Sequence, residues 1–230
     1  MGGCRAVAGT KRGQRNAACF HAILRAGSEL VACCVCESDM SATFLVTGFE
    51  PFAEHRTNSS WDALELLRPS WPSAIVARRL PVDYLLAHQE LRRALTELRP
   101  RAVLCTGLAR GEVFRIEQRA RRPAALAAVP GDAESWGRWP WDELRRALTD
   151  AGVRSIDSSD AGQYVCESTY WSLLNCGQDS PLAPEFAAFL HVPPESALFP
   201  LETIARAVGS VVQRRWAELS LPRGLNEEMV

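Results

Sequence analysis

The run Ala42-Thr-Phe-Leu-Val-Thr47, which ends at Gly48, decides how the fold begins. It is short, apolar and rich in β-branched residues, which is typical of a strand buried on both faces. Similar runs follow at Ala74–Leu80, Ala102–Thr106 and Ala187–Val192. Because stretches with helical spacing separate these runs, the sequence predicts an α/β fold: a three-layer α/β/α sandwich around a twisted, open, mostly parallel sheet.

The expected helices are marked by apolar spacing and by their ends. We expect them over residues 60–67, 84–98, 141–151, 166–174 and 201–219. Asp83 is the expected N-cap of the second helix, and Ser59 or Ser60 that of the first. Residues 112–120 alternate between apolar and charged side chains and predict a further strand, and residues 153–156 predict a short one.

The composition is that of an ordinary globular protein. Of 230 residues, 47% are apolar and 23% are charged, and the formal net charge is -1. These values exclude a disordered chain and a dedicated nucleic-acid binder. The arginines from Arg110 to Arg122 are interrupted by acids and have only Phe114 as an aromatic platform, so we interpret them as a solvated face rather than a phosphate-binding surface.

The cysteines are unevenly distributed. Five of the eight lie within residues 1–36. A disulfide framework would be spread through the fold, so this distribution favours a reducing compartment, and we predict a cytoplasmic protein. Cys33, Cys34 and Cys36 have no matching Cys or His pair at zinc-ligand spacing, and no metal site is predicted.

The residues before Met40 differ from the rest of the chain. They are basic and then apolar, and Leu30-Val-Ala-Cys33 has the pattern of a lipoprotein cleavage box. Arg25 and Glu29 interrupt the apolar run, however, and a charge in mid-membrane costs roughly 2.5–3.5 kcal/mol. We expect no membrane segment, and interpret residues 1–39 as an N-terminal extension, disordered or the product of an over-long gene prediction, and residues 40–230 as one α/β domain.

Three side chains with complementary chemistry lie in or near expected strands. Cys166 closes Gly162-Gln-Tyr-Val-Cys166 at the start of an expected helix, where unpaired N–H groups and the helix dipole favour a thiolate. His191 ends an apolar strand just before two prolines, and Glu117 lies on the charged face of its strand. A thiol, an imidazole base and a carboxylate that orients the base are what cysteine catalysis requires.

Each of the three also has a structural interpretation that the sequence leaves open. Cys166 could be a buried small apolar side chain, His191 a core histidine with satisfied hydrogen bonds, and Glu117 a solvated charge on an edge strand.

Several motifs nevertheless resemble the pyroglutamyl peptidase I family, cysteine peptidases that remove N-terminal pyroglutamate. Val46-Thr-Gly-Phe-Glu-Pro-Phe52 resembles the opening motif of that family, and Asn58-Ser-Ser-Trp61 is similar to its Asn-Pro-Ser-Trp. Gly162-Gln-Tyr-Val-Cys166 is similar to the nucleophile motif Gly-Thr-Tyr-Val-Cys. Leu80-Pro-Val82 and Leu190-His-Val-Pro193 resemble two further segments, so that the resemblance spans about residues 42–217.

The resemblance implies a function and a site. Cys166 would be the nucleophile, His191 the base and Glu117 the orienting carboxylate, while Phe49 and Phe52 would line an apolar pocket for the lactam ring. It further implies a cytosolic enzyme without a cofactor, commonly a homo-oligomer, that acts on peptides with N-terminal pyroglutamate and binds neither nucleic acid nor membrane.

The middle of the chain departs from the family pattern. Leu108 replaces a glutamine of the family motif, and the segment that leads to Glu117 is one residue shorter than in the family. The family's Glu-Arg-Val-Ala-Ile-Asn becomes Glu117-Gln-Arg-Ala-Arg-Arg122, and the asparagine after the cysteine is Glu167. An arginine implicated in oxyanion stabilisation is missing, for which Arg119 or Arg121 could compensate. The alternative function is therefore a family member that binds pyroglutamyl-type peptides without efficient cleavage.

Overall fold

The computed structural model describes residues 21–26, 29–34, 43–52, 56–176 and 183–221. The chain divides into two compact units, Met1–Ser41 and Ala42–Val230. In the first unit, β1 (His21–Ala26) and β2 (Glu29–Cys34) pair as an antiparallel hairpin. The rest of the expected N-terminal extension lies outside the described residues, and its interpretation stays a prediction.

The second unit is built on a six-stranded sheet with the order β4-β3-β5-β10-β6-β9. The strands β4, β3, β5 and β10 run parallel to one another, β6 is antiparallel to β10, and β9 is parallel to β6. The predicted mostly parallel α/β architecture is therefore confirmed. The strands are β3 (Phe44–Phe49), β4 (Ile75–Leu80), β5 (Ala102–Leu108), β6 (Phe114–Glu117), β9 (Ser155–Ser158) and β10 (Phe186–Val192).

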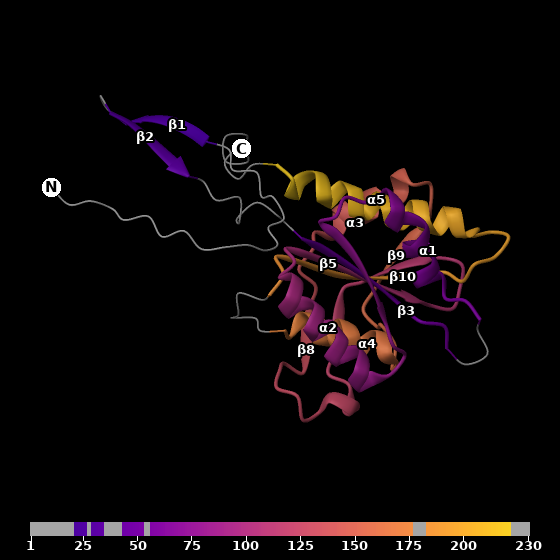
Figure 1. Ribbon diagram of the computed structural model, residues 1–230. Helices are drawn as coiled ribbons and strands as arrows, with labels where there is room; N and C mark the ends of the chain where they lie inside the picture. Colours follow the sequence, from indigo (N-terminus) through magenta and orange to yellow (C-terminus); the bar gives the residue numbers. More distant parts are fainter. Residues whose placement is uncertain (1–20, 27–28, 35–42, 53–55, 177–182, 222–230) are drawn as a thin grey trace, which may run out of the picture. The chain divides into compact units, whose positions relative to one another are not determined.

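Helices cover both faces of this sheet (Figure 1). On one face lie α1 (Ser59–Leu67), α3 (Trp141–Asp150) and α5 (Leu201–Leu219). On the other lie α2 (Tyr84–Leu98) and α4 (Val165–Leu174), with a ribbon of β7 (Arg119–Arg121) and β8 (Glu134–Trp136). Two short 3-10 turns, η2 (Arg68–Ser70) and η3 (Ala124–Leu126), complete the unit.

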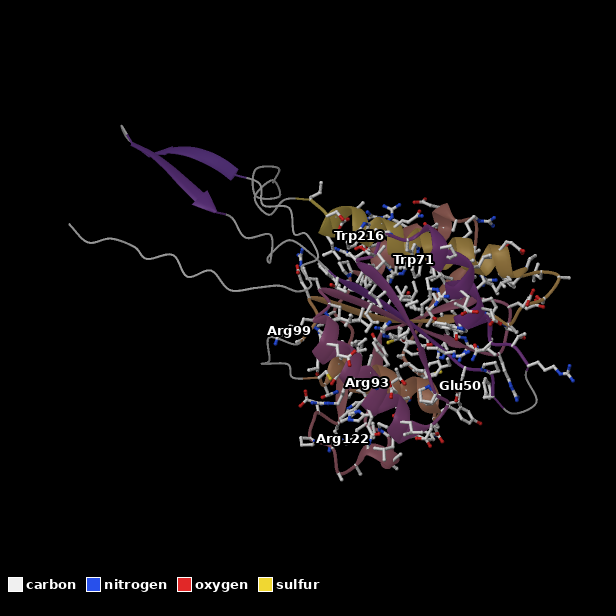
Figure 2. All side chains as sticks on the ribbon, viewed as in Figure 1. Glu50, Trp71, Arg93, Arg99, Arg122 and Trp216 are labelled. Atoms are coloured by element: carbon white, nitrogen blue, oxygen red, sulfur yellow. The ribbon has the colours of Figure 1, made fainter. Side chains whose placement is uncertain are left out.

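Side-chain alternation divides the core into two clusters. Along β10, Ala188 and Leu190 pack toward α1, α3 and α5, whereas Ala187 and Phe189 pack toward α2 and α4. Successive side chains of a strand point to opposite faces, so His191 shares the α2–α4 face with Phe189. Figure 2 shows side chains filling both layers, with Trp71 and Trp216 on the α5 side and Arg93 and Arg122 on the α2 side.

Three local features differ from the sequence predictions. The expected strand over residues 112–120 is two strands, because β6 stays in the main sheet while β7 leaves it to pair with β8. The N-cap of α1 is Asn58, whose side chain accepts the N–H of Ser60, rather than Ser59 or Ser60. The expected 153–156 strand lies two residues further along, as β9, where it pairs with β6.

In the part of the chain that the structure describes, no helix combines the length and the apolar character that a membrane crossing needs.

Candidate active site

His191 and Glu117 form a buried hydrogen-bonded pair near the carboxyl ends of β10 and β6. His191 Nδ1 lies 2.7 Å from Glu117 Oε1, and both side chains are buried. The pair joins adjacent strands, because β10 runs antiparallel to β6 and Phe189 is opposite Glu117. With Nδ1 engaged by the carboxylate, Nε2 is the nitrogen of His191 left to exchange a proton with another group.

The burial of Glu117 decides between the two interpretations of that residue. A solvated edge-strand charge is wrong, because β9 pairs with the far side of β6 and Glu117 is fully buried. Tyr170 of α4 donates its hydroxyl to the carbonyl of Glu117 at 3.0 Å and so ties the helix to this strand. A buried carboxylate held against an imidazole is suited to stabilise that imidazole in its charged form.

Cys166 reaches the same face of the sheet from the first turn of α4. An added Cβ at Gly107 would lie 2.8 Å from Cys166 Sγ and 2.8 Å from Phe189 Cζ. Gly107 is also the residue paired with His191 across β5 and β10. The thiol therefore lies over β10, which carries the imidazole, and its neighbour β5, in space that is open because residue 107 has no side chain. Sequence reasoning missed Gly107, whose one signal was its place at the end of a buried strand.

The surroundings of the thiol favour its neutral form. Burial raises the pKa of Cys166 to about 12, with the charge of Glu117 acting in the same direction. The expected lowering of this pKa at a helix start is therefore wrong, because loss of solvation in the closed interior outweighs the backbone N–H of Cys166 that favours the thiolate. Ionisation of the sulfur at neutral pH then requires that its proton passes to a neighbouring base.

The two aromatic residues predicted to line a substrate pocket lie in different environments. Phe49, at the end of β3, is 2% exposed and belongs to the same apolar cluster as Cys166 and Phe189. Phe52, three residues further, is 36% exposed. The structure thus brings Phe49 into the core beside the site, whereas Phe52 is at the surface.

The polar residues of the opening motifs hold the strand ends in place. Glu50 Oε1 accepts the N–H of Val82 at 3.1 Å, and the side chain of Asn58 donates to the carbonyl of Glu50 at 3.0 Å. Ser59 donates its hydroxyl to the carbonyl of Pro193, 2.8 Å away and just beyond His191. Segments far apart in the sequence are therefore fixed around the carboxyl ends of β3, β4 and β10.

The two arginines considered as oxyanion donors are both engaged elsewhere. Arg119 forms an ion pair with Glu134 and donates to the carbonyl of Ser159. Arg121 is paired with Asp160 and with Glu167. Glu167, which follows the thiol in the sequence, turns its side chain to Arg121 and accepts that residue's backbone N–H at 2.6 Å.

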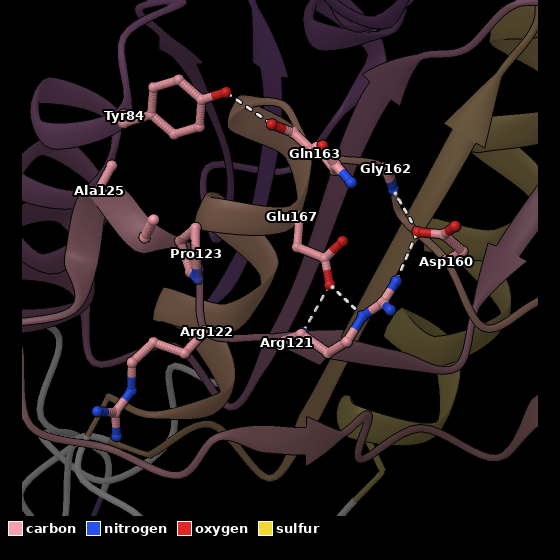
Figure 3. Close-up of a pocket in the computed structure, with 10 residues that line it drawn as sticks. Tyr84, Arg121, Arg122, Pro123, Ala125, Asp160, Gly162, Gln163 and Glu167 are labelled. Carbon is pink, nitrogen blue, oxygen red and sulfur yellow. Dashed lines mark hydrogen bonds and ion pairs between the residues drawn. The ribbon is translucent and has the colours of Figure 1, made fainter.

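A cavity of about 460 Å³ lies beside the pair formed by Arg121 and Glu167 (Figure 3). It is bordered by Tyr84, by the turn that begins at Pro123 and by the loop that leads into Cys166. Among the described residues, no group of three or more His, Cys, Asp and Glu side chains has the arrangement of a metal site.

The close approach of Gly107 to the sulfur gives a testable prediction. Gly107→Ala should lower kcat by about 10²-fold, the scale of a roughly 1 Å displacement of a reacting group, because Cys166 or Phe189 must move. Steady-state kinetics on a chromogenic or fluorogenic amide measure it. Gly209→Ala in α5 is the control, since its Cβ would meet only the flexible end of Leu67 at 3.0 Å. A wild-type kcat for Gly107→Ala would contradict the placement of the thiol.

Most of the second unit is similar in sequence to known proteins. The family model described as pyroglutamyl peptidase matches residues 42–207. The chain is 32% identical over 168 residues to a pyrrolidone-carboxylate peptidase of Clavibacter michiganensis, covering 66% of this chain and 78% of that protein. It is 30% identical over 198 residues to one of Pseudomonas fluorescens, covering 75% and 92%.

Solved structures share the fold. Pyroglutamyl peptidase I of Bacillus amyloliquefaciens is similar with a TM-score of 0.65 at 23% identity, over 77% of this chain and 98% of that one. Pyrrolidone carboxyl peptidase of Thermococcus litoralis has a TM-score of 0.66 at 23% identity, over 77% and 94%. With the family model spanning most of the second unit and relatives matched over most of their length, the chain belongs to the pyroglutamyl peptidase family.

Proposed function

We propose that this protein is a cysteine peptidase that removes N-terminal pyroglutamate from peptides, with Cys166 as nucleophile, His191 as base and Glu117 as the carboxylate that orients the base. The observation that carries the residue roles is the 2.7 Å hydrogen bond between His191 and Glu117 beneath the helix that presents Cys166. These are the parts of a thiol–imidazole–carboxylate mechanism, in a buried setting.

The proposed reaction begins from the neutral thiol of Cys166 and the neutral imidazole of His191. His191 Nε2 takes the proton of the Cys166 thiol as the sulfur attacks the carbonyl that follows pyroglutamate, and Glu117 stabilises the resulting imidazolium. His191 then returns the proton to the leaving amine, which gives a thioester. Water, deprotonated by His191, hydrolyses the thioester and releases pyroglutamate and the thiol.

Oxyanion stabilisation is assigned to the start of α4. The N–H groups of Glu167 and Ser168 donate to the carbonyl of Tyr164 at 3.1 and 3.4 Å, which leaves those of Val165 and Cys166 as candidate donors. A preorganised donor of this kind contributes about 10²–10³ in rate. This assignment does not need the arginine that the family pattern has and this chain lacks. We propose Phe49 and Phe52 as the apolar residues that contact the lactam ring.

The alternative, a protein that binds pyroglutamyl-type peptides without cleaving them, is not favoured. Three departures from the family pattern suggested it: Leu108, Glu167 and the absent arginine. Glu167 faces Arg121, so one of these departures is compensated within the chain.

The purified protein should hydrolyse a fluorogenic pyroglutamyl amide and leave the matching prolyl amide intact. The prolyl ring has the same size but carries a protonated amine in place of the neutral lactam, so the pair tests recognition of the lactam as a whole. Binding of a pyroglutamyl peptide without product formation would instead support the alternative function. Hydrolysis of both amides at equal rates would contradict selectivity for the lactam.

The compartment, assembly and partners of the enzyme are proposed from the same resemblance to the family. We propose a cytoplasmic homo-oligomer that uses no cofactor and binds neither nucleic acid nor membrane, with residues 40–230 as its peptidase domain. Cys105, Cys166 and Cys176 are all free thiols, which supports a reducing compartment. Fractionation of cells, light scattering of the purified protein and N-terminal sequencing of the natural product test the compartment, the assembly and the extent of residues 1–39.

A further inference from the structure

Arg121 contacts the chain on both sides of Cys166. Its Nη2 lies 2.7 Å from Asp160 Oδ1, and its Nε lies 3.5 Å from Glu167 Oε1. The backbone N–H of Arg121 donates to the same oxygen of Glu167 at 2.6 Å. Figure 3 shows the guanidinium between the two carboxylates, one from the loop before the nucleophile and one from the helix after it.

Both carboxylates are coupled to the backbone that places Cys166. Glu167 is the next residue, in the first turn of α4, with a side chain only 7% exposed. Asp160 Oδ1 also accepts the N–H of Gly162 at 3.2 Å. Gly162 has a φ of +86°, a left-handed conformation that glycine adopts readily, and there the loop turns toward the nucleophile.

The start of α4 depends on these contacts. Tyr164 is its N-cap residue and makes no side-chain capping bond. On the opposite side of the loop, the hydroxyl of Tyr84 donates to the carbonyl of Gln163 at 2.7 Å. Among the described residues, the loop and first turn are therefore held from one side by Tyr84 and from the other by Arg121.

We propose that Arg121 is a positioning residue for the nucleophile, which fixes Cys166 by binding Asp160 before it and Glu167 after it. The inference rests on the proposed role of Cys166. Arg121 and Glu167 stand where the family motifs have isoleucine and asparagine, so two departures from the pattern are one charged pair. Without Arg121, the buried carboxylate of Glu167 would lack its cation, and the turn that carries Cys166 would shift or reorganise.

The test compares four variants with the wild-type full-length protein: Arg121→Ile, Glu167→Asn, the double variant, and Arg101→Ile. Arg101 is the matched control. Its Nη2 lies 2.7 Å from Glu185 Oε2, an ion pair just before β5 and β10, at the opposite end of these strands from His191. Three quantities are measured: kcat and KM on the pyroglutamyl amide, the rate of Cys166 alkylation by iodoacetamide, followed by mass spectrometry, and the midpoint of urea unfolding.

Arg121→Ile should lower kcat by about 10- to 100-fold with little change in KM, because the sulfur is displaced while the lactam pocket is not. The alkylation rate should fall in parallel, since a displaced neutral thiol loses access to its base. The double variant, which has no buried unpaired carboxylate, should recover most of the loss. Arg101→Ile should lower only the unfolding midpoint.

Two outcomes would overturn the proposal: wild-type kcat and alkylation in Arg121→Ile, or losses in the double variant that equal the product of the single losses. A lower unfolding midpoint with unchanged kcat would likewise assign Arg121 a purely structural role. If the wild-type protein cleaves no pyroglutamyl amide, the proposed function fails, and the alkylation rates alone decide whether Arg121 positions Cys166.

Discussion

Cys166→Ala is expected to lower kcat/KM on a pyroglutamyl amide by at least about 10⁴-fold, because no other atom in the site can form the covalent intermediate. The change removes one sulfur from a closely packed region and should cost only about 1 kcal/mol of stability. Binding of a pyroglutamyl peptide should persist, since the pocket and the backbone donors remain. Fluorogenic kinetics and calorimetry on the same preparations measure the two effects separately.

The matched control is Cys176→Ala. Cys176 is also a free, buried cysteine, two residues beyond the end of α4 and therefore at the far end of the helix from Cys166. Its replacement should leave kcat unchanged. Equal turnover by Cys166→Ala and the wild-type protein would reject the assigned nucleophile, whereas loss of activity in both variants would point to a general effect of cysteine removal.

Glu117→Gln should lower kcat by about 10²- to 10⁴-fold while the protein stays folded. If the amide oxygen faces His191 Nδ1, the hydrogen bond survives, but the negative charge that stabilises the imidazolium is gone. If the amide nitrogen faces Nδ1, it forces the other tautomer, in which Nε2 carries a proton and cannot accept one from the thiol. Glu117 Oε2 is buried with no hydrogen-bond partner among the described residues, so neither orientation gains a compensating contact there.

Steady-state kinetics, with circular dichroism to confirm folding, measure this effect. Glu134→Gln is the control, because Glu134 pairs with Arg119 in the β7–β8 ribbon, outside the six-stranded sheet that carries His191. A wild-type kcat in Glu117→Gln would show that the carboxylate is a structural partner of the imidazole and not part of the mechanism.

Much of the architecture follows from local sequence. Asp83 and Pro100 delimit α2, and the apolar stripe of residues 201–219 matches α5 in full. Such ends are set by short-range chemistry: a side chain that accepts the first N–H groups, or a proline that cannot continue a helix. The sequence motifs also identify the thiol, imidazole and carboxylate residues of the candidate site.

The features that the sequence does not predict depend on contacts between segments that are far apart in the chain. Alternation places Glu117 on the charged face of its strand, but only the pairing of β6 with β9 and the packing of α4 bury that face. Likewise, Glu167 and Arg121 are 46 positions apart in the sequence. Taken alone, each is an unfavourable departure from the residue in the family motif. Neither local spacing nor hydropathy contains the information that the two side chains meet.

The antiparallel pairing of β6 with β10 also affects how such an enzyme can diversify. It places the proton-handling residues inside the sheet, where backbone hydrogen bonds constrain every neighbour. Peptide selectivity must then be adjusted in the connecting loops, which tolerate exchange far better than strands. Related proteins can therefore acquire new preferences for the residue after the lactam without changes to the catalytic residues.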